Sequence, residues 1–474
     1  MTSAAVVGSG PNGLAAAIVL AREGIEVEVF ERNDAFGGGC RTDALTLPGF
    51  SHDVCSAIHP LGVGSPFFKS LDLPQQGLHW VYPEAELAHP LDDGTAVMVK
   101  RSVEETAAAL GPDEKAYLRM IRPLARNASR LIDEVLRPPR VPRHPLVMAA
   151  FGALAVRSVT GLAGGMFETD RARALLAGVG AHSVLPLDRS PTAAYALTLL
   201  ILAHHVGWPM PKGGSQRITE ALLAQLGSLG GQAHAGRNIE SLGELSRFSA
   251  KLFDVAPLNL ARIAGDAFPE VYRRKLTDYR HGPGVFKMDF ALSGPIPWKA
   301  PECALAGTVH VGGTMEEIAL SEEQAWSGIS PDKPFLILAQ PTLFDDTRAP
   351  SGKHVAWAYC HVPAGDDFDM SARITDQIER FAPGFRDLIM SDHAMAPSDL
   401  QARNPNYIGG DISGGVQDWG QLFNRPAGFI DPYATPAPDI FICSSSTPPG
   451  GGVHGMCGYF AARSALKSAP IKPR

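Results

Sequence analysis

The start of the chain alternates short apolar runs with glycine-rich and polar turns. Residues 4–7 form an apolar run that predicts a buried strand, and residues 14–20 are good helix formers. A second apolar run covers residues 27–30 and ends at Glu31. The order of strand, helix and strand predicts a β-α-β unit at the beginning of the chain.

Three glycines lie in the turn between the first strand and the helix, in the spacing G-x-G-x-x-G. Gly8 permits the tight turn, Gly10 lets the backbone approach a pyrophosphate, and Gly13 allows the helix to pack against the strand. The helix N-terminus offers free N–H groups and a positive dipole end to phosphates. Glu31, 18 residues after Gly13, is placed to accept hydrogen bonds from ribose hydroxyls. The pattern predicts a dinucleotide site in preference to an ordinary strand-turn-helix.

The rest of the chain divides into a helical part, a strand-rich part and a second glycine-rich turn. Between residues 103 and 206, Ala and Leu recur at helical spacing, which predicts a mainly helical insertion. Residues 285–363 contain runs of aromatic and branched residues, typical of strands that floor a substrate cavity. Residues 92–95 predict a hairpin turn, and residues 370–381 predict a helix. A last apolar run, residues 439–443, precedes a turn rich in serine and glycine and so repeats the opening arrangement.

Composition excludes several classes of protein. A chain of 474 residues is too long to fold around one ordinary hydrophobic core, so two or three domains are expected. The net charge of −7 and the lack of a long basic run argue against nucleic-acid binding. None of the six cysteines has C-x-x-C spacing, so the sequence predicts neither a dithiol redox centre nor a metal site. No apolar run reaches about 18 residues and the first strand leaves no room for a signal peptide, which predicts a cytoplasmic location.

A second glycine turn follows Glu31 and Arg32. Its successive glycines, Gly37 to Gly39, let backbone N–H groups turn toward an anionic or carbonyl ligand. Arg41 would add a fixed positive charge near a pyrophosphate. The alternative is an ordinary glycine-rich turn with a surface arginine. The adjoining G-x-G-x-x-G motif favours the role in ligand binding.

Followed by Glu31-Arg32, a glycine pair and Thr42, the fingerprint resembles the flavoprotein group that includes amine oxidases and phytoene desaturases. The C-terminal turn extends the resemblance to a T-x-P-G-x-G-x-x-G segment of phytoene desaturase-like flavoproteins. His454 departs from it, because carotenoid desaturases usually have proline there, and no carboxylate occupies the turn that contacts ribitol in many FAD enzymes. Over nearly the whole chain, the sequence is most similar to phytoene dehydrogenase-related oxidoreductases, in particular the pyridine nucleotide-disulphide oxidoreductase domain-containing protein 2 branch. The matching residues of the C-terminal segment are Thr447, Pro449, Gly450, Gly452 and Gly455.

The resemblance implies an α/β fold: a Rossmann-type FAD-binding domain of the glutathione reductase-like, amine oxidase or phytoene desaturase type, with an inserted α+β substrate domain. The FAD-binding domain is expected to be discontinuous, over residues 1–70, 210–285 and 425–474, and the substrate domain to cover residues 71–209 and 286–424. FAD is the implied cofactor, whereas spacing alone leaves FAD and NAD open. The expected cofactor-binding residues are Gly8, Gly10, Pro11, Asn12, Gly13, Glu31, Arg32, Gly38, Gly39, Arg41, Thr42, Ile239, Ser446, Gly452, Val453 and Gly455.

The implied function is that of an FAD-dependent dehydrogenase or desaturase. Such an enzyme moves a hydride from an apolar small molecule to flavin, and oxygen or a quinone reoxidises the flavin. His454 beside the flavin ring is the first candidate for a base or a flavin-tuning group, and Tyr407 is the second. Three alternatives stay open: a flavin-dependent isomerase of the same fold, an amine oxidase and a non-catalytic lipid-binding module. Peripheral contact with a membrane surface also stays open, and the sequence gives no oligomeric state.

Overall fold

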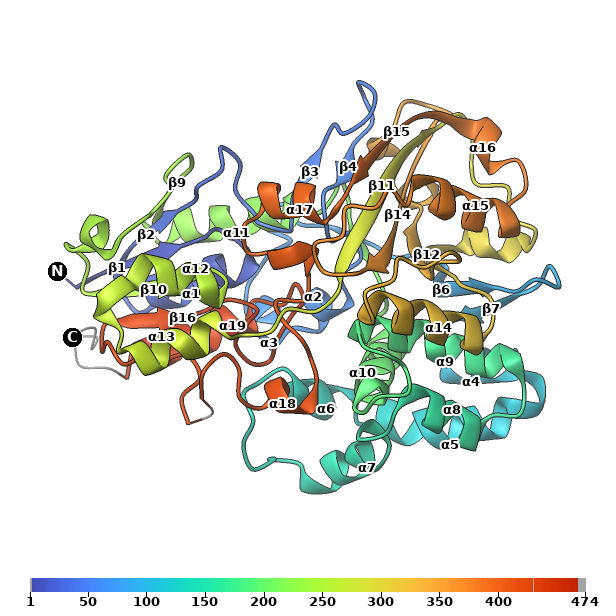
Figure 1. Cartoon of the computed structure of the whole chain (residues 1–474), viewed down its shortest axis with the longest axis horizontal. Helices are drawn as coiled ribbons and strands as arrows, with labels where there is room; N and C mark the ends of the chain where they lie inside the picture. The colour runs from blue at the N-terminus through green and yellow to red at the C-terminus, as the bar shows by residue number, and fades with distance from the viewer. Residues whose placement is uncertain (1, 429, 468–474) are drawn as a thin grey trace.

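The computed structural model describes residues 2–428 and 430–467 and contains two large sheets and a layer of helices (Figure 1). The outer ends of the predicted cofactor domain, residue 1 and residues 468–474, lie outside the described residues, as does residue 429. The first sheet has five parallel strands in the order β16-β10-β1-β2-β9. These strands are β1 (Ser3–Val7), β2 (Glu26–Phe30), β9 (Gln232–His234), β10 (Ala250–Phe253) and β16 (Ile440–Ile442).

The predicted β-α-β unit is the centre of this sheet. Its helix, α1 (Pro11–Arg22), starts at a proline whose fixed φ suits the first helical turn, and it is buried along nearly its whole length. The helices α11 (Gln216–Ser228) and α19 (Met456–Ala465) cover it. At Gly458 in α19, an added Cβ would overlap a backbone oxygen of α1, so the two helix backbones are in direct contact. This contact brings the C-terminal glycine-rich turn next to the N-terminal one.

The second sheet has seven strands in the order β15-β11-β14-β13-β12-β6-β7. All its pairs are antiparallel except β12 with β6. The turn at residues 92–95 joins β6 to β7, which confirms the predicted hairpin. The strands are β6 (Ala85–Pro90), β7 (Ala96–Val99), β11 (Gly284–Leu292), β12 (Ala306–Val311), β13 (Leu336–Ala339), β14 (His354–Val362) and β15 (Ile389–Met395).

A layer of helices packs below this sheet, at the lower right of Figure 1. Its central member, α10 (Thr192–His205), is apolar on most sides because other helices surround it. The predicted helical insertion is therefore present. The layer consists of α4 (Val103–Ala108), α5 (Glu114–Ala125), α6 (Ala128–Val135), α7 (Pro145–Ala155), α8 (Val159–Met166), α9 (Asp170–Gly180) and α10, with α14 (Met315–Trp326) against α9.

The remaining elements connect these layers. The helix predicted over residues 370–381 is confirmed as α15 (Ser371–Phe381). Among the described residues, no single helix has the length and apolarity to cross a membrane, and α7 and α8 meet that test only as a pair bent by 91°. The connecting elements are β3 (Thr42–Asp43), β4 (His52–Asp53), α2 (Pro60–Gly64), α3 (Pro66–Lys69), β5 (Trp80–Val81), β8 (Met210–Pro211), α12 (Pro257–Ala264), α13 (Glu270–Thr277), α16 (Phe385–Leu388), α17 (Pro397–Arg403) and α18 (Trp419–Leu422).

The architecture confirms the predicted α/β class with a parallel Rossmann-type sheet and a second, mixed sheet. The five parallel strands fall within the segments expected for the cofactor domain, and the seven mixed strands fall outside those segments except for the start of β11. The exact domain boundaries stay a prediction.

Candidate cofactor and substrate site

One continuous cavity of about 1130 Å³ runs from the parallel sheet to the mixed sheet. At one end it is lined by residues at the carboxyl ends of β1, β2, β10 and β16, the edge where open α/β sheets bind their ligands. At the other end it is lined by β12, β13 and β14 and by side chains of α7 and α10. The same space therefore offers a nucleotide end and a mainly apolar chamber.

The N-terminal glycines shape the first end. Gly8 has a φ of +100°, which L side chains rarely adopt, and a Cβ on Gly13 would overlap the Gly8 carbonyl oxygen. A Cβ on Gly10 would stand 2.7 Å from a carboxylate oxygen of Asp254. Each glycine of the fingerprint is thus required by a close approach. Gly8, Gly10, Pro11 and Asn12 line the cavity, whereas Gly13 lies behind them.

Glu31 organises the loop that faces this end. Its Oε2 accepts hydrogen bonds from the Ser9 backbone N–H at 3.1 Å and the Ser9 hydroxyl at 2.7 Å, and its Oε1 accepts one from the Asn33 N–H at 3.0 Å. The side chain is buried, yet Glu31, Arg32 and Asn33 all line the cavity. The carboxylate keeps acceptor capacity on Oε1 for a ligand hydroxyl.

The second glycine turn packs directly on the first. Gly38 has a φ of +57°, and a Cβ there would stand 3.2 Å from the Cα of Gly10. Both Gly38 and Gly39 line the cavity. Arg41 and Thr42 do not: the Thr42 hydroxyl instead donates to Asp53 Oδ1 at 2.8 Å and accepts from a backbone N–H of α11 at 3.1 Å. Thr42 therefore holds the turn in place from behind.

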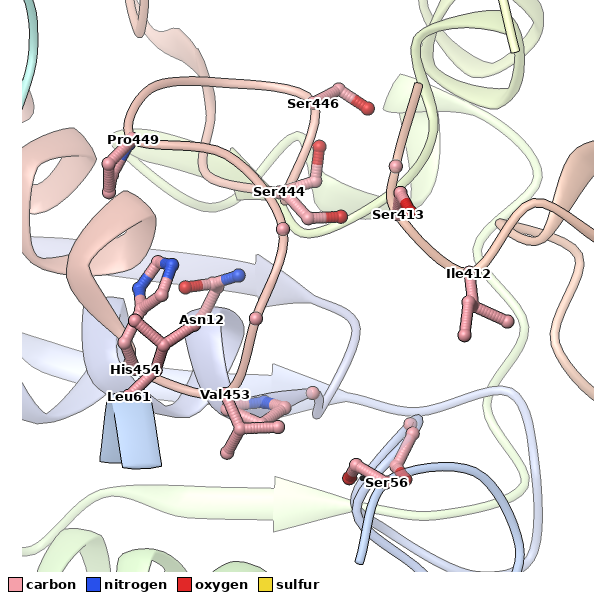
Figure 2. A pocket seen from close by; sticks show the side chains of 18 of the residues that line it. Asn12, Ser56, Leu61, Ile412, Ser413, Ser444, Ser446, Pro449, Val453 and His454 are labelled. Atoms are coloured by element: carbon pink, nitrogen blue, oxygen red, sulfur yellow. Dashed lines mark hydrogen bonds between the residues drawn. The ribbon is translucent and has the colours of Figure 1, made fainter. Parts of the chain in front are cut away.

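The C-terminal turn closes the cavity from a third side (Figure 2). The predicted residues Ser446, Gly452 and Val453 line the cavity, whereas Gly455 lies at the start of α19 with a φ of +68°. Ile239, which the sequence places near an adenine, also lines the cavity.

Both ring nitrogens of His454 bond to backbone. Nδ1 accepts from the Met456 N–H at 3.0 Å, so Nε2 carries the hydrogen and donates to the Gly450 carbonyl at 3.2 Å. Burial lowers the pKa of His454 to about 4, so the ring is neutral. Figure 2 shows this ring folded back beside its own loop. The geometry gives His454 a capping role at α19, and its participation in chemistry stays a prediction.

Tyr407 lines the cavity beside Gly39. Its hydroxyl donates to Cys55 Sγ at 3.5 Å. Burial, followed by the neighbouring thiol of Cys55, raises the pKa of Tyr407 well above its ordinary value. The phenol is therefore protonated at neutral pH and suited to donate a hydrogen bond. The predicted catalytic role of Tyr407 stays a prediction.

Asp254 was not expected from the sequence. It follows β10, lines the cavity and accepts the Gly13 backbone N–H at 2.9 Å, although 241 residues separate the two. The pKa of Asp254 is raised to about 7, mainly by burial; the Gly13 hydrogen bond acts to lower it and the charge of Glu31 acts to raise it. A carboxyl group therefore stands at the helix N-terminus where phosphates are expected.

Two further polar atoms in this part of the cavity have no hydrogen-bond partner in the part of the chain that the structure describes. Asn12 Oδ1 and Ser444 Oγ are both buried without a hydrogen bond among the described residues, and both residues line the cavity. Buried polar atoms normally have partners, so the pair fits a polar ligand between the two glycine turns.

The far end of the cavity is aromatic and aliphatic. Trp357 and Tyr359 stack with their ring centroids 5.5 Å apart and pair with Ala339 and Ile337, respectively, of the neighbouring strand. Tyr195 of α10 donates its hydroxyl hydrogen to Gln417 at 2.6 Å. The lining of this end is mostly apolar, and Trp357 Nε1 and Thr308 Oγ1 have no hydrogen-bond partner among the described residues, which suits a mainly apolar guest.

Comparisons with known proteins agree with this architecture. Residues 6–71 match the NAD(P)-binding Rossmann-like domain. The chain is 24% identical to pyridine nucleotide-disulfide oxidoreductase domain-containing protein 2 of Mus musculus, over 97% of this chain and 92% of the relative. It is 28% identical to all-trans-retinol 13,14-reductase of Danio rerio, over 48% of this chain and 40% of the relative.

A solved structure of a putrescine oxidase variant, made by redesign of cofactor binding, superposes with a TM-score of 0.63. The match covers 98% of this chain and 99% of that one at 16% identity, and so shows the fold. The chain is therefore similar in sequence to proteins named as oxidoreductases and shares the fold of a putrescine oxidase. The predicted resemblance is confirmed. The predicted fold type is also confirmed, since amine oxidases are among the structural neighbours.

Proposed function

We propose that the protein is an FAD-dependent dehydrogenase or desaturase of an apolar organic substrate, with oxygen or a quinone as the final acceptor. The observation that carries the proposal is the single cavity that joins the two glycine turns to the aromatic chamber. A cofactor held by the turns would extend toward that chamber. The name of one relative, a retinol reductase, supports an apolar substrate.

The residues at the nucleotide end fit FAD. Gly8, Gly10 and Gly38 line the cavity where a pyrophosphate would lie, and Glu31 retains an acceptor for ribose. Asn12 and Ser444 offer polar atoms without a hydrogen-bond partner among the described residues. Bound FAD would supply the acceptor for a hydride. The protein would position the substrate C–H bond in the chamber and exclude water from it.

The charge distribution favours an apolar substrate over an amine. Among the described lining residues, the carboxylates are Glu31, Glu134, Glu240 and Asp254. Glu134 bonds to the backbone N–H groups of residues 143 and 144, and the other three flank the nucleotide end. A protonated amine beside Trp357 would therefore lack a carboxylate partner. Cytoplasmic location, peripheral membrane contact and the isomerase and lipid-binding alternatives stay predictions.

The decisive experiment combines flavin content with anaerobic reduction. Purified protein is expected to release FAD on denaturation, and the intact holoprotein is expected to lose its flavin absorbance when mixed anaerobically with polyenes or terpenoid alcohols. Product mass two hydrogens below substrate mass would identify dehydrogenation, whereas unchanged mass with reduced flavin would identify isomerisation. Protein that neither contains nor takes up FAD would instead support the lipid-binding alternative.

Replacement of Glu31 tests the nucleotide end directly. Glu31→Ala is expected to weaken FAD binding about tenfold to a hundredfold, since charge-assisted hydrogen bonds contribute about 1.5–3 kcal/mol. It also leaves the Ser9 N–H without its partner. Isothermal titration of apoprotein with FAD measures the effect, and Glu26→Ala, at an exposed position on the same strand, is the control. Equal FAD affinities for the two variants would show that Glu31 does not contribute to FAD binding.

A further inference from the structure

Three histidines lie close together where the chamber meets the mixed sheet. His182 is half-buried in the cavity wall, just after α9, and His310 and His89 are fully buried on the adjacent strands β12 and β6. The proposed function leaves this cluster without a role. Buried polar groups that lack partners cost about 1–3 kcal/mol each, so their presence needs an explanation.

The first two rings are directly hydrogen-bonded. His182 Nε2 and His310 Nε2 are 3.0 Å apart, so one ring donates its hydrogen and the other accepts it. The ring centroids are 5.0 Å apart, and Trp208 packs edge-on against both rings. The His182 ring is thus held in the cavity wall by an aromatic side chain as well as by its partner.

The other nitrogens of His310 and His89 both lie beside Gly178 of α9. Nδ1 of each ring has no hydrogen-bond partner among the described residues. A Cβ on Gly178 of α9 would stand 2.9 Å from His310 Nδ1 and 3.2 Å from His89 Nδ1, so both atoms approach this glycine.

His89 continues the sequence of polar groups toward the surface. Its Nε2 donates to the Gly313 carbonyl at 2.7 Å. The next residue donates its N–H to Glu317 Oε2 at 3.2 Å, and that carboxylate oxygen is 3.0 Å from Arg380. Arg380 also pairs with the exposed Asp92. The polar groups therefore extend from the cavity wall to a charged group at the protein surface.

The three rings are neutral at physiological pH. Burial, followed by the charge of His361, lowers the pKa of His182 to about 3. Burial lowers the pKa of His89 to about 4, against its Gly313 hydrogen bond, and lowers that of His310 well below its ordinary value. A neutral imidazole can accept a proton on one nitrogen while it releases one from the other.

We propose that His182, His310 and His89 form a proton path that leads away from the substrate chamber. The inference rests on the proposed function, which requires an acceptor for a proton. In a dehydrogenation, bound FAD would accept a hydride with two electrons from one C–H bond. The neighbouring C–H bond would leave its electron pair in the new double bond and give its proton to His182. His182 would pass its Nε2 hydrogen to His310 Nε2, so the positive charge would leave the chamber wall for the buried rings.

The first test needs neither flavin nor substrate. In protein with isotope-labelled histidines, NMR of the ring nitrogens is expected to show that His310→Phe changes the tautomer of His182. His204→Gln is the control, because His204 is a buried histidine that bonds to Tyr117 at 2.7 Å and lies outside the cavity lining. An unchanged His182 spectrum in the His310 variant would overturn the pairing.

The second test uses holoenzyme with a substrate from the anaerobic screen. His310→Phe is expected to slow flavin reduction about a hundredfold, the usual contribution of a positioned proton acceptor, with substrate affinity retained. Gly178→Ala keeps all three histidines, but its Cβ would stand 2.9 Å from His310 Nδ1 and displace that ring, so it is expected to slow the same step about tenfold. Its control is Gly164→Ala in α8, where an added Cβ meets nothing within 4 Å.

The outcomes separate this inference from the proposed function. If substrate reduces the wild-type flavin and the His310 and Gly178 variants react as fast as their controls, the proton path is overturned. The dehydrogenase proposal is then unaffected. Wild-type protein that binds no flavin would refute the proposed function itself. Slow reduction in both variants, with normal rates in both controls, would support the path.

Discussion

Gly458→Ala is expected to lower the free energy of unfolding by about 3 kcal/mol or more and to abolish retention of FAD. The added Cβ would overlap the Asn12 carbonyl oxygen and stand 2.9 Å from the Ala16 nitrogen, both backbone atoms of α1. Since backbone cannot rotate aside as a side chain can, α19 must move away from α1. That movement displaces the two glycine turns that begin these helices. Urea unfolding of the apoprotein and flavin content of the purified protein measure the two effects.

Gly227→Ala provides the matched control. Gly227 lies inside α11, which also packs on α1, but an added Cβ there meets nothing within 4 Å. Alanine is the better helix former, so this variant is expected to gain about 0.5–1 kcal/mol. If both variants lost stability equally, the close contact between α1 and α19 would not be the cause.

The sequence was most informative where the signal is local. Gly8, Gly10, Gly13 and Glu31 lie within one β-α-β unit, and each has a short-range reason for its place: a turn, a close approach or a strand end. The long apolar runs that became β11 and β14 were also recognisable, because both strands are buried along most of their length and most of their residues are apolar. The sequence alone therefore predicted which residues form one end of the cavity.

Features that depend on distant contacts were missed. Asp254 is an ordinary aspartate after a strand until the fold brings Gly13 to it. The edge strand β15 alternates half-buried and exposed positions and carries few strand-forming residues, so its pattern resembles a loop. The histidines at positions 89, 182 and 310 come from three separate elements, and nothing in their spacing relates them. The polar side chains at the apolar end of the cavity could therefore be identified only from the tertiary structure.

The apoprotein should become less stable as pH rises because of Asp254. Its pKa is raised to about 7, mainly by burial, whereas an unfolded aspartate titrates near about 4. Between these values the unfolded chain has lost the proton and the native state keeps it, so the free energy of unfolding falls with increasing pH. The loss is absent below about pH 4 and complete above about pH 7. Asp254→Asn should therefore stabilise the apoprotein more at pH 8 than at pH 5, as thermal unfolding at the two pH values would show.

The same carboxyl group is expected to make FAD binding depend on pH. A pyrophosphate at the N-terminus of α1 would lie beside Gly10, whose Cβ position is 2.7 Å from Asp254 Oδ2. Two negative charges there repel each other, so binding favours protonated Asp254 and raises its pKa further. Above about pH 7, FAD affinity should fall by up to tenfold per pH unit in the wild type and stay level in Asp254→Asn. Titrations at pH 6, 7 and 8 measure both slopes, with Asp43→Asn as an exposed control. A wild-type affinity that is equal at pH 6 and pH 8, or a slope that persists in the Asp254 variant, would place the pyrophosphate away from this carboxyl group.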